Sequence, residues 1–78
     1  MEYTVVFFTH SGAIKYHRYL KSIGIDNETM PVPRRLSSNC GIGVRFKGDI
    51  DINNMITEDI EKIFKFEKGN YIEVYNCG

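Results

Sequence analysis

The sequence predicts an α+β protein: a ferredoxin-like βαββαβ sandwich, with two helices on one face of a four-stranded antiparallel sheet. Three observations lead to this prediction. Four segments are rich in β-branched and aromatic residues or alternate in polarity, two others repeat apolar residues at three- and four-residue steps, and turn formers separate most of them. Right-handed crossovers then give the strand order 4-1-3-2. We expect the 78 residues to form a single domain, 1–78.

The first half of the chain is expected to hold two strands and one helix. The run Tyr3 to Phe8 is β-branched and aromatic with little alternation, which is typical of a central strand. Pro31 lacks the N–H that a sheet ladder needs, so residues 27–32 are predicted to form an edge strand. Between these strands, capping candidates at 9–12 and at Gly24 bracket a helical stripe of Ala13, Tyr16, Leu20 and Ile23.

The second half is expected to hold two strands with a helix between them. Residues 42–47 alternate between apolar and polar types and predict a half-buried strand. Gly69-Asn70 breaks the chain, and the alternating residues 71–75 predict the last strand. Between them, after a turn region at 48–54, the second helix is predicted on the stripe of Ile56, Ile60, Ile63 and Phe64.

Charge and composition exclude several classes of function. Ten basic and ten acidic residues cancel, whereas nonspecific nucleic-acid binders carry a basic excess. The longest wholly apolar run, Val5 to Phe8, is too short to span a membrane, and the first residues show no secretory leader, so we expect a cytoplasmic protein. Its two cysteines are then expected to be free thiols. Their spacing fits no zinc site, and no metal or other cofactor is expected.

The predicted topology gives Cys40 a distinctive environment. Cys40 lies at the start of the predicted third strand, just before residues 42–47. His10 lies at the same end of the sheet, where the first strand leads into the first helix. By alternation Cys40 shares the parity of Ile42, so its sulfur is expected on the helix side, near the helix N-terminus. The partial positive charge of a helix N-terminus, with Arg34 or Arg35 nearby, is the setting that lowers the pKa of a thiol. The sequence therefore indicates a reactive cysteine, although a buried, inert cysteine is an open alternative.

The neighbours of Cys40 each have a functional and a structural interpretation. Gly41 would let a small anion or a partner's backbone approach closely, as would Gly43. Ser37 and Ser38 could donate hydrogen bonds to an anion or cap turns of their own loop. For the remaining candidates, His10 could act as a general base or a capping residue, and the guanidinium groups of Arg34 and Arg35 could hold an anion or remain solvated.

The second cysteine, Cys77, follows the last predicted strand. In the predicted topology it lies at the opposite end of the sheet from Cys40, about a strand length or roughly 17–20 Å away. A disulfide needs Cα atoms within about 7 Å. We therefore expect no bridge between the two cysteines within one folded chain.

The segment around Cys40 also carries a family resemblance. The stretch Pro31-Val32-Pro33-Arg34-Arg35-Leu36-Ser37-Ser38-Asn39-Cys40-Gly41, followed by Arg45-Phe46, resembles the small selenium/sulfur carrier-like family of bacterial and archaeal proteins. Phe7-Phe8 and Ala13 support the resemblance, which covers nearly the whole chain. It implies a carrier role in which the motif cysteine, here Cys40, holds sulfur or selenium.

Two hypotheses of function follow. In the first, a cysteine desulfurase-like donor loads Cys40 as a persulfide or selenopersulfide and an acceptor protein removes the atom, so the chain is a carrier rather than an enzyme. In the second, the chain is an interaction or regulatory module with an inert cysteine. Such a module could pair as a homodimer through an open sheet face that presents Tyr71, Tyr75 and residues of the first strand. RNA binding is disfavoured, because the exposed positions of the third strand, Gly43, Arg45 and Lys47, include no aromatic residue.

Overall fold

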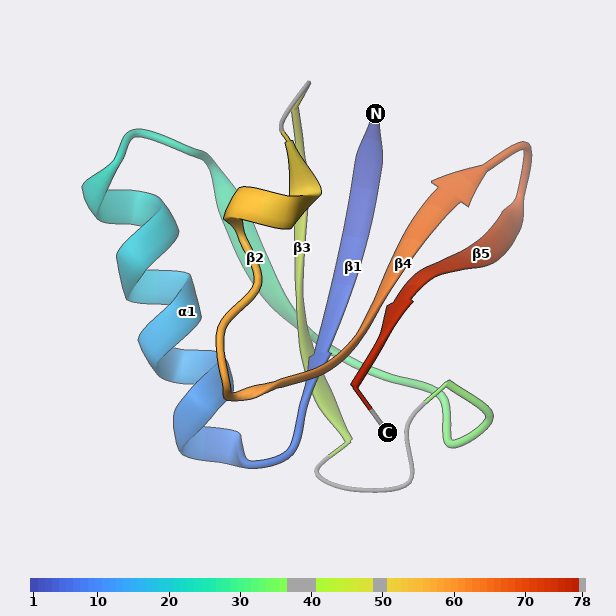
Figure 1. Ribbon diagram of the computed structural model, residues 1–78, viewed down its shortest axis with the longest axis horizontal. Helices are drawn as coiled ribbons and strands as arrows, with labels where there is room; N and C mark the ends of the chain where they lie inside the picture. The colour runs from blue at the N-terminus through green and yellow to red at the C-terminus, as the bar shows by residue number, and fades with distance from the viewer. Residues whose placement is uncertain (37–40, 49–50, 78) are drawn as a thin grey trace.

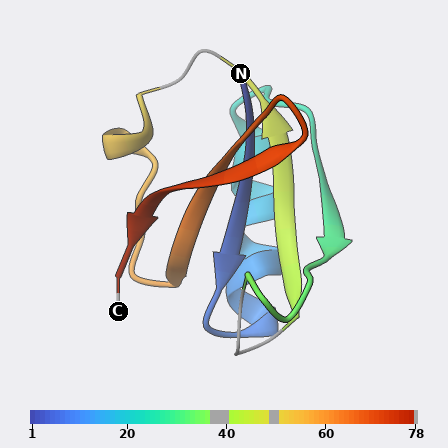
Figure 2. The same ribbon diagram turned by 90° about the vertical axis from the view of Figure 1, so that its right-hand side faces the viewer.

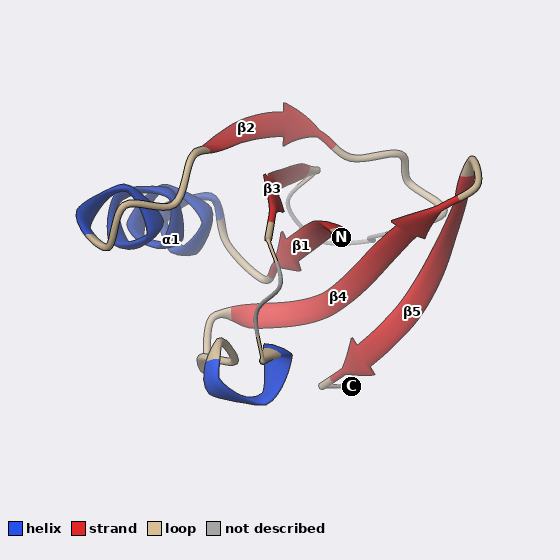
Figure 3. Cartoon of the chain, turned by 90° about the horizontal axis from the view of Figure 1, so that it is seen from above, coloured by secondary structure: helices blue, strands red, loops and turns tan. Residues whose placement is uncertain are grey.

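The computed structural model describes residues 1–36, 41–48 and 51–77. These residues form one antiparallel sheet with the strand order β2-β3-β1-β4-β5, and α1 packs on one face of it (Figure 1; Figure 3). In chain order the elements are β1 (Glu2–Phe7), α1 (His10–Ser22), β2 (Asn27–Pro31), β3 (Ile42–Lys47), the 3-10 turn η1 (Ile52–Asn54), β4 (Ile60–Glu67) and β5 (Asn70–Asn76).

The predicted ferredoxin-like sandwich, with four strands in the order 4-1-3-2 and two helices, is wrong. The segment expected to form the second helix contains β4, which pairs with β1 from Ile60 to Phe66. The last strand, β5, consequently lies outside β4 at the edge of the sheet instead of beside β1 (Figure 1). In place of a second helix, the segment around η1 packs on the same face as α1 through Ile52, Met55 and Ile56.

A β-bulge explains why β4 carries a helix-like spacing of apolar residues. Val6 pairs with Lys62 but Phe7 pairs with Ile60, so Glu61 is an extra residue in β4. Because the bulge shifts the alternation by one, Ile60 and Ile63 point to the same face although they are three residues apart. Three-residue spacing is also what a helix produces, and the pattern alone does not separate the two.

The other helix and strands form where the sequence predicted them along the chain. The Oγ1 atom of Thr9 caps α1 by accepting a hydrogen bond from Gly12 N at 3.1 Å. After the helix, Gly24 adopts a positive φ of 82° and closes the C-terminus. β2, with Pro31 as its last residue, lies at a sheet edge as expected. Among the described residues, no helix is both long and apolar enough to cross a lipid bilayer.

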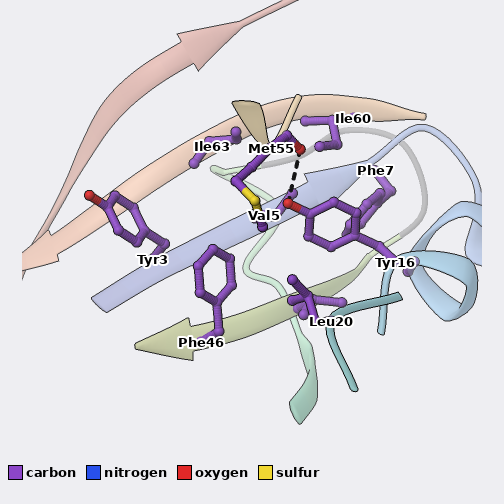
Figure 4. Packing of buried hydrophobic residues seen from close by; sticks show 11 residues of the cluster. Tyr3, Val5, Phe7, Tyr16, Leu20, Phe46, Met55, Ile60 and Ile63 are labelled. Carbon is purple, nitrogen blue, oxygen red and sulfur yellow. Dashed lines mark hydrogen bonds between the residues drawn. The ribbon is translucent and has the colours of Figure 1, made fainter. Parts of the chain in front are cut away.

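Each face of the sheet carries a cluster of buried apolar side chains. On the α1 face, Tyr16 donates a hydrogen bond from its hydroxyl to Met55 O at 3.0 Å and packs within the main core (Figure 4). On the other face, a second cluster joins Val6 and Phe64 to Val32 and Leu36, two residues of the segment that follows β2. Figure 2 shows this segment on the side of the sheet opposite α1. The residues of β1 from Tyr3 to Phe7 are buried, so they cannot supply a dimer surface.

Candidate functional site

One end of the sheet, which we call the motif end, gathers termini of all five strands and the start of α1. Strand pairing places these termini together: Pro31 with Ile42, Val6 with Gly43, Phe7 with Ile60, and Lys62 with Asn76. His10, the first residue of α1, follows β1 at this end and is exposed. The segment 32–36 also begins at this end, but Figure 1 shows it on the other side of the sheet from the start of α1, so the structure does not bring it beside His10.

The predicted anion-binding residues are only partly described. Arg34 and Arg35 are exposed in a turn that the hydrogen bond from Leu36 N to Pro33 O closes at 2.9 Å. Ser37, Ser38 and Cys40 fall within 37–40, outside the described residues, and their roles stay predictions. Arg45, which is part of the family resemblance, forms an ion pair with Glu28 between the neighbouring strands β3 and β2.

Gly41 marks where the strand geometry ends on the approach to Cys40. Its carbonyl oxygen accepts a hydrogen bond from Val32 N at 2.9 Å, and its φ of +70° is left-handed. Regular alternation therefore does not extend from Ile42 through Gly41, and the argument that parity turns the Cys40 sulfur toward the helix loses its basis. A Cβ on Gly41 would meet no atom of the described residues within 4 Å, and the role of Gly41 in the close approach of an anion stays a prediction.

Gly43 has a packing role instead of the predicted role in close approach by a partner. It is buried, and a Cβ there would lie 2.6 Å from Val32 Cγ2. The same Cβ would lie 2.7 Å from Val5 O in the neighbouring strand. The missing side chain thus makes room for Val32, which packs the start of the segment 32–36, which we call the motif segment, against the sheet.

Val32 and Leu36 hold the motif segment on the face opposite α1. Both are buried in the cluster with Val6 and Phe64. These two apolar anchors were not predicted from the sequence, and the placement of the Cys40 sulfur on the helix side stays a prediction. Their signal was available in the sequence, because Val32 and Leu36 are the apolar residues in an otherwise polar loop.

Cys77 lies at the motif end, and its predicted position at the opposite end is wrong. Because β4 is a strand rather than a helix, the chain reverses once more and β5 ends beside the start of β4. Cys77 N donates a hydrogen bond to the carbonyl oxygen of the bulge residue Glu61 at 2.9 Å, and its thiol is free and exposed. β5 is nevertheless three strand spacings from β3, or roughly 14 Å.

The side chain of Tyr75 lies within hydrogen-bonding distance of the Cys77 thiol. A side-chain hydrogen bond with Cys77 raises the pKa of Tyr75, and removal from water and the charge of Cys77 act in the same direction. Among the described residues, no group of three His, Cys, Asp or Glu side chains could hold a metal ion.

The family comparison agrees with the resemblance found in the sequence. The model of the family described as "Putative Se/S carrier protein-like" matches residues 2–76. The chain belongs to this family. The match confirms the predicted resemblance, and it spans the motif segment as well as every strand of the Se/S carrier-like chain. Comparison with curated proteins and with solved structures gives no significant match.

Proposed function

We propose that the protein carries sulfur or selenium as a persulfide or selenopersulfide on Cys40. A donor of the cysteine desulfurase type loads the thiol, and an acceptor protein removes the atom. The observation that carries this proposal is membership of the Se/S carrier-like family over a match that includes the whole motif segment. Carrier proteins exchange their cargo with other proteins, so both donor and acceptor are expected to dock at the motif end.

The described residues around 37–40 support this assignment. Val32 and Leu36 anchor the segment before Cys40 to the sheet, and the hydrogen bond from Val32 N to Gly41 O fixes the chain just after it. A short segment between two fixed points can present a thiol to a partner at a defined place. The exposed guanidinium groups of Arg34 and Arg35 add positive charge, which favours a thiolate or an anionic persulfide.

The transfer steps need no net oxidation or reduction. The Cys40 thiolate attacks the outer sulfur of a cysteine persulfide on the donor, the S–S bond of the donor breaks, and the donor cysteine leaves as a thiolate. An acceptor thiolate then attacks the outer sulfur on Cys40 in the same way. In this scheme His10 receives the proton of the Cys40 thiol, a role it is free to play because Thr9 already caps α1.

Intact-mass measurement after loading tests the proposal. The wild-type chain, Cys40→Ser and Cys77→Ser are incubated with a cysteine desulfurase and cysteine. We expect wild type and Cys77→Ser to gain the mass of sulfur, and Cys40→Ser to remain unloaded. Loading of Cys40→Ser at the wild-type level, or no added sulfur on any chain, would refute the carrier role of Cys40.

One observation favours a second function, that of an interaction module. β5 is an edge strand whose Ile72 and Val74 are 46% and 45% exposed, and such an edge can pair with a strand of another chain. Pairing with a second copy would give a homodimer, in which Tyr71 and Tyr75 flank the interface. Sedimentation of wild type and Val74→Lys over a range of concentrations tests it, since only the wild type should then associate.

A further inference from the structure

A cavity of about 280 Å³ lies between α1 and the segment that precedes β4. It is adjacent to the motif end, because Phe8 N donates a hydrogen bond to Asp59 O at 3.1 Å just before α1 begins. A Cβ on Gly12 would lie 2.9 Å from Asp59 Cβ, so the helix and the segment 57–59 are in close contact at the base of the cavity. A cavity of this size accepts one side chain or a small molecule, not a large cofactor.

Two tyrosine rings form the helix side of the cavity. Tyr16 is only 3% exposed, packs against Phe7 with ring centroids 5.3 Å apart, and is fixed further by its hydrogen bond to Met55 O. Tyr19 is 47% exposed, and its ring centroid lies 6.2 Å from that of Tyr16. One rigid and one exposed aromatic ring thus line the cavity. Such rings attract cations through their negative faces.

The charged residues that line the cavity leave one carboxylate uncompensated. Lys15 Nζ lies 3.4 Å from Asp59 Oδ2 and offsets that carboxylate. Glu58, also part of the lining, is exposed and forms no ion pair with any residue that the structure describes. The lining therefore combines two aromatic rings with a net negative charge, which is the complement of an ammonium or guanidinium group.

We propose that this cavity binds a guanidinium or ammonium group, presented as an arginine or lysine side chain by a protein that exchanges sulfur with Cys40. The assignment of the partner rests on the proposed carrier function, whereas the preference for a cation rests on the cavity alone. The basic side chain lies over Tyr19 with its charge against Glu58. The partner is thereby held next to the motif end of the sheet, on the face that carries α1.

The preference for a cation is tested by NMR titration of the full chain with N-acetyl-arginine amide. N-acetyl-citrulline amide, which has nearly the same shape but no charge, is the matched control ligand. We expect the arginine compound to shift the amide signals of Tyr16, Tyr19 and Glu58, and the citrulline compound to leave them unchanged. Tyr19→Leu and Glu58→Gln should each weaken binding by about two- to fivefold, the effect of losing one exposed cation–π or ionic contact. Glu73→Gln, which removes an exposed carboxylate on β5, should leave binding unchanged.

A second measurement tests the partner. The rate of sulfur loading from the desulfurase is measured at limiting donor for wild type, Tyr19→Leu, Glu58→Gln and Glu73→Gln. Slower loading of the two cavity variants, with the same final mass as wild type, supports docking of the donor at the cavity. Equal binding of the two amides would overturn the cation site. Loading of both cavity variants at the wild-type rate would overturn the partner assignment, while a chain that binds the arginine amide but takes up no sulfur would refute the carrier function alone.

Discussion

Val32 lies over Gly43, and the space between them is too small for a single methyl group. A Cβ on Gly43 would come within 2.6 Å of Val32 Cγ2 and within 2.7 Å of Val5 O. The contact joins the first residue after β2 to β3 at the motif end of the sheet, on the face opposite α1. Through it, the packing of the fold determines where the motif segment starts.

Gly43→Ala should therefore lower the free energy of unfolding by about 1–3 kcal/mol, the usual cost of overpacking a core. Adding Val32→Ala should restore only part of the loss, because the clash with the backbone oxygen of Val5 remains. Gly41→Ala is the matched control: among the described residues its Cβ meets no atom within 4 Å, and its left-handed φ costs about 1–2 kcal/mol. Denaturant unfolding checks all three chains, and a Gly43→Ala variant as stable as wild type would contradict the packing.

The hydroxyl of Thr4, on the same face of the sheet, is predicted to lower the stability of the fold. The Thr4 side chain is fully buried, and Oγ1 has no hydrogen-bond partner within the part of the chain that the structure describes. Thr4→Val keeps the shape and removes the unpaired hydroxyl, so it should raise the free energy of unfolding by about 1 kcal/mol. Thr4→Ser, which keeps the hydroxyl and loses a methyl group, should lower it. Destabilisation by the valine variant would mean that the hydroxyl is in fact paired.

Tyr16 should make the stability of the protein fall in alkali. Burial raises the pKa of Tyr16 from 10.0 to about 12, and the nearby Tyr19 acts in the same direction. Because the folded state favours the neutral phenol, this stabilisation is complete below pH 10 and is lost as the pH rises toward 12. Tyr16→Phe should flatten the fall in unfolding free energy over this range, whereas Tyr19→Phe should retain most of it. An equally steep fall in Tyr16→Phe would show that other groups cause it.

The hairpin between β4 and β5 depends on a turn of two residues. Lys68 and Gly69 have φ values of 51° and 79°, the pair of positive angles found in a type I′ turn. Gly69→Ala should cost about 1–2 kcal/mol, since a side chain is strained in the left-handed region. Lys68→Asn should be neutral or slightly stabilising, because asparagine tolerates that conformation. Thermal unfolding distinguishes the two outcomes, and a stable Gly69→Ala variant would argue against the turn.

Local signals predicted the elements that depend on local interactions. Thr9 and Gly24 mark the two ends of α1 in the sequence, and Pro31 marks β2 as an edge strand. β4 was missed because the bulge at Glu61 gives a strand the three-residue spacing of a helix. That bulge is set by pairing with β1, far away in the sequence, and no local pattern reports it.

The same error changed the expected site. Once β4 is a strand, β5 runs in the opposite direction from the prediction, and Cys77 moves from the far end of the sheet to the motif end. The family resemblance was visible from the residues around Cys40, whereas the face on which the residues 32–36 rest depends on the packing of Val32 and Leu36. The exposed thiol of Cys77 therefore lies at the end where transfer by Cys40 is proposed, and the two cysteines must be distinguished directly.

Peptide mapping of the sulfur-loaded wild-type chain makes that distinction. After free thiols and persulfides are alkylated, trypsin cleavage at Arg35 and Arg45 releases residues 36–45 with Cys40, and cleavage at Lys68 releases residues 69–78 with Cys77. The carrier account predicts the additional sulfur on the peptide 36–45. Additional sulfur found mainly on the peptide 69–78 would contradict it.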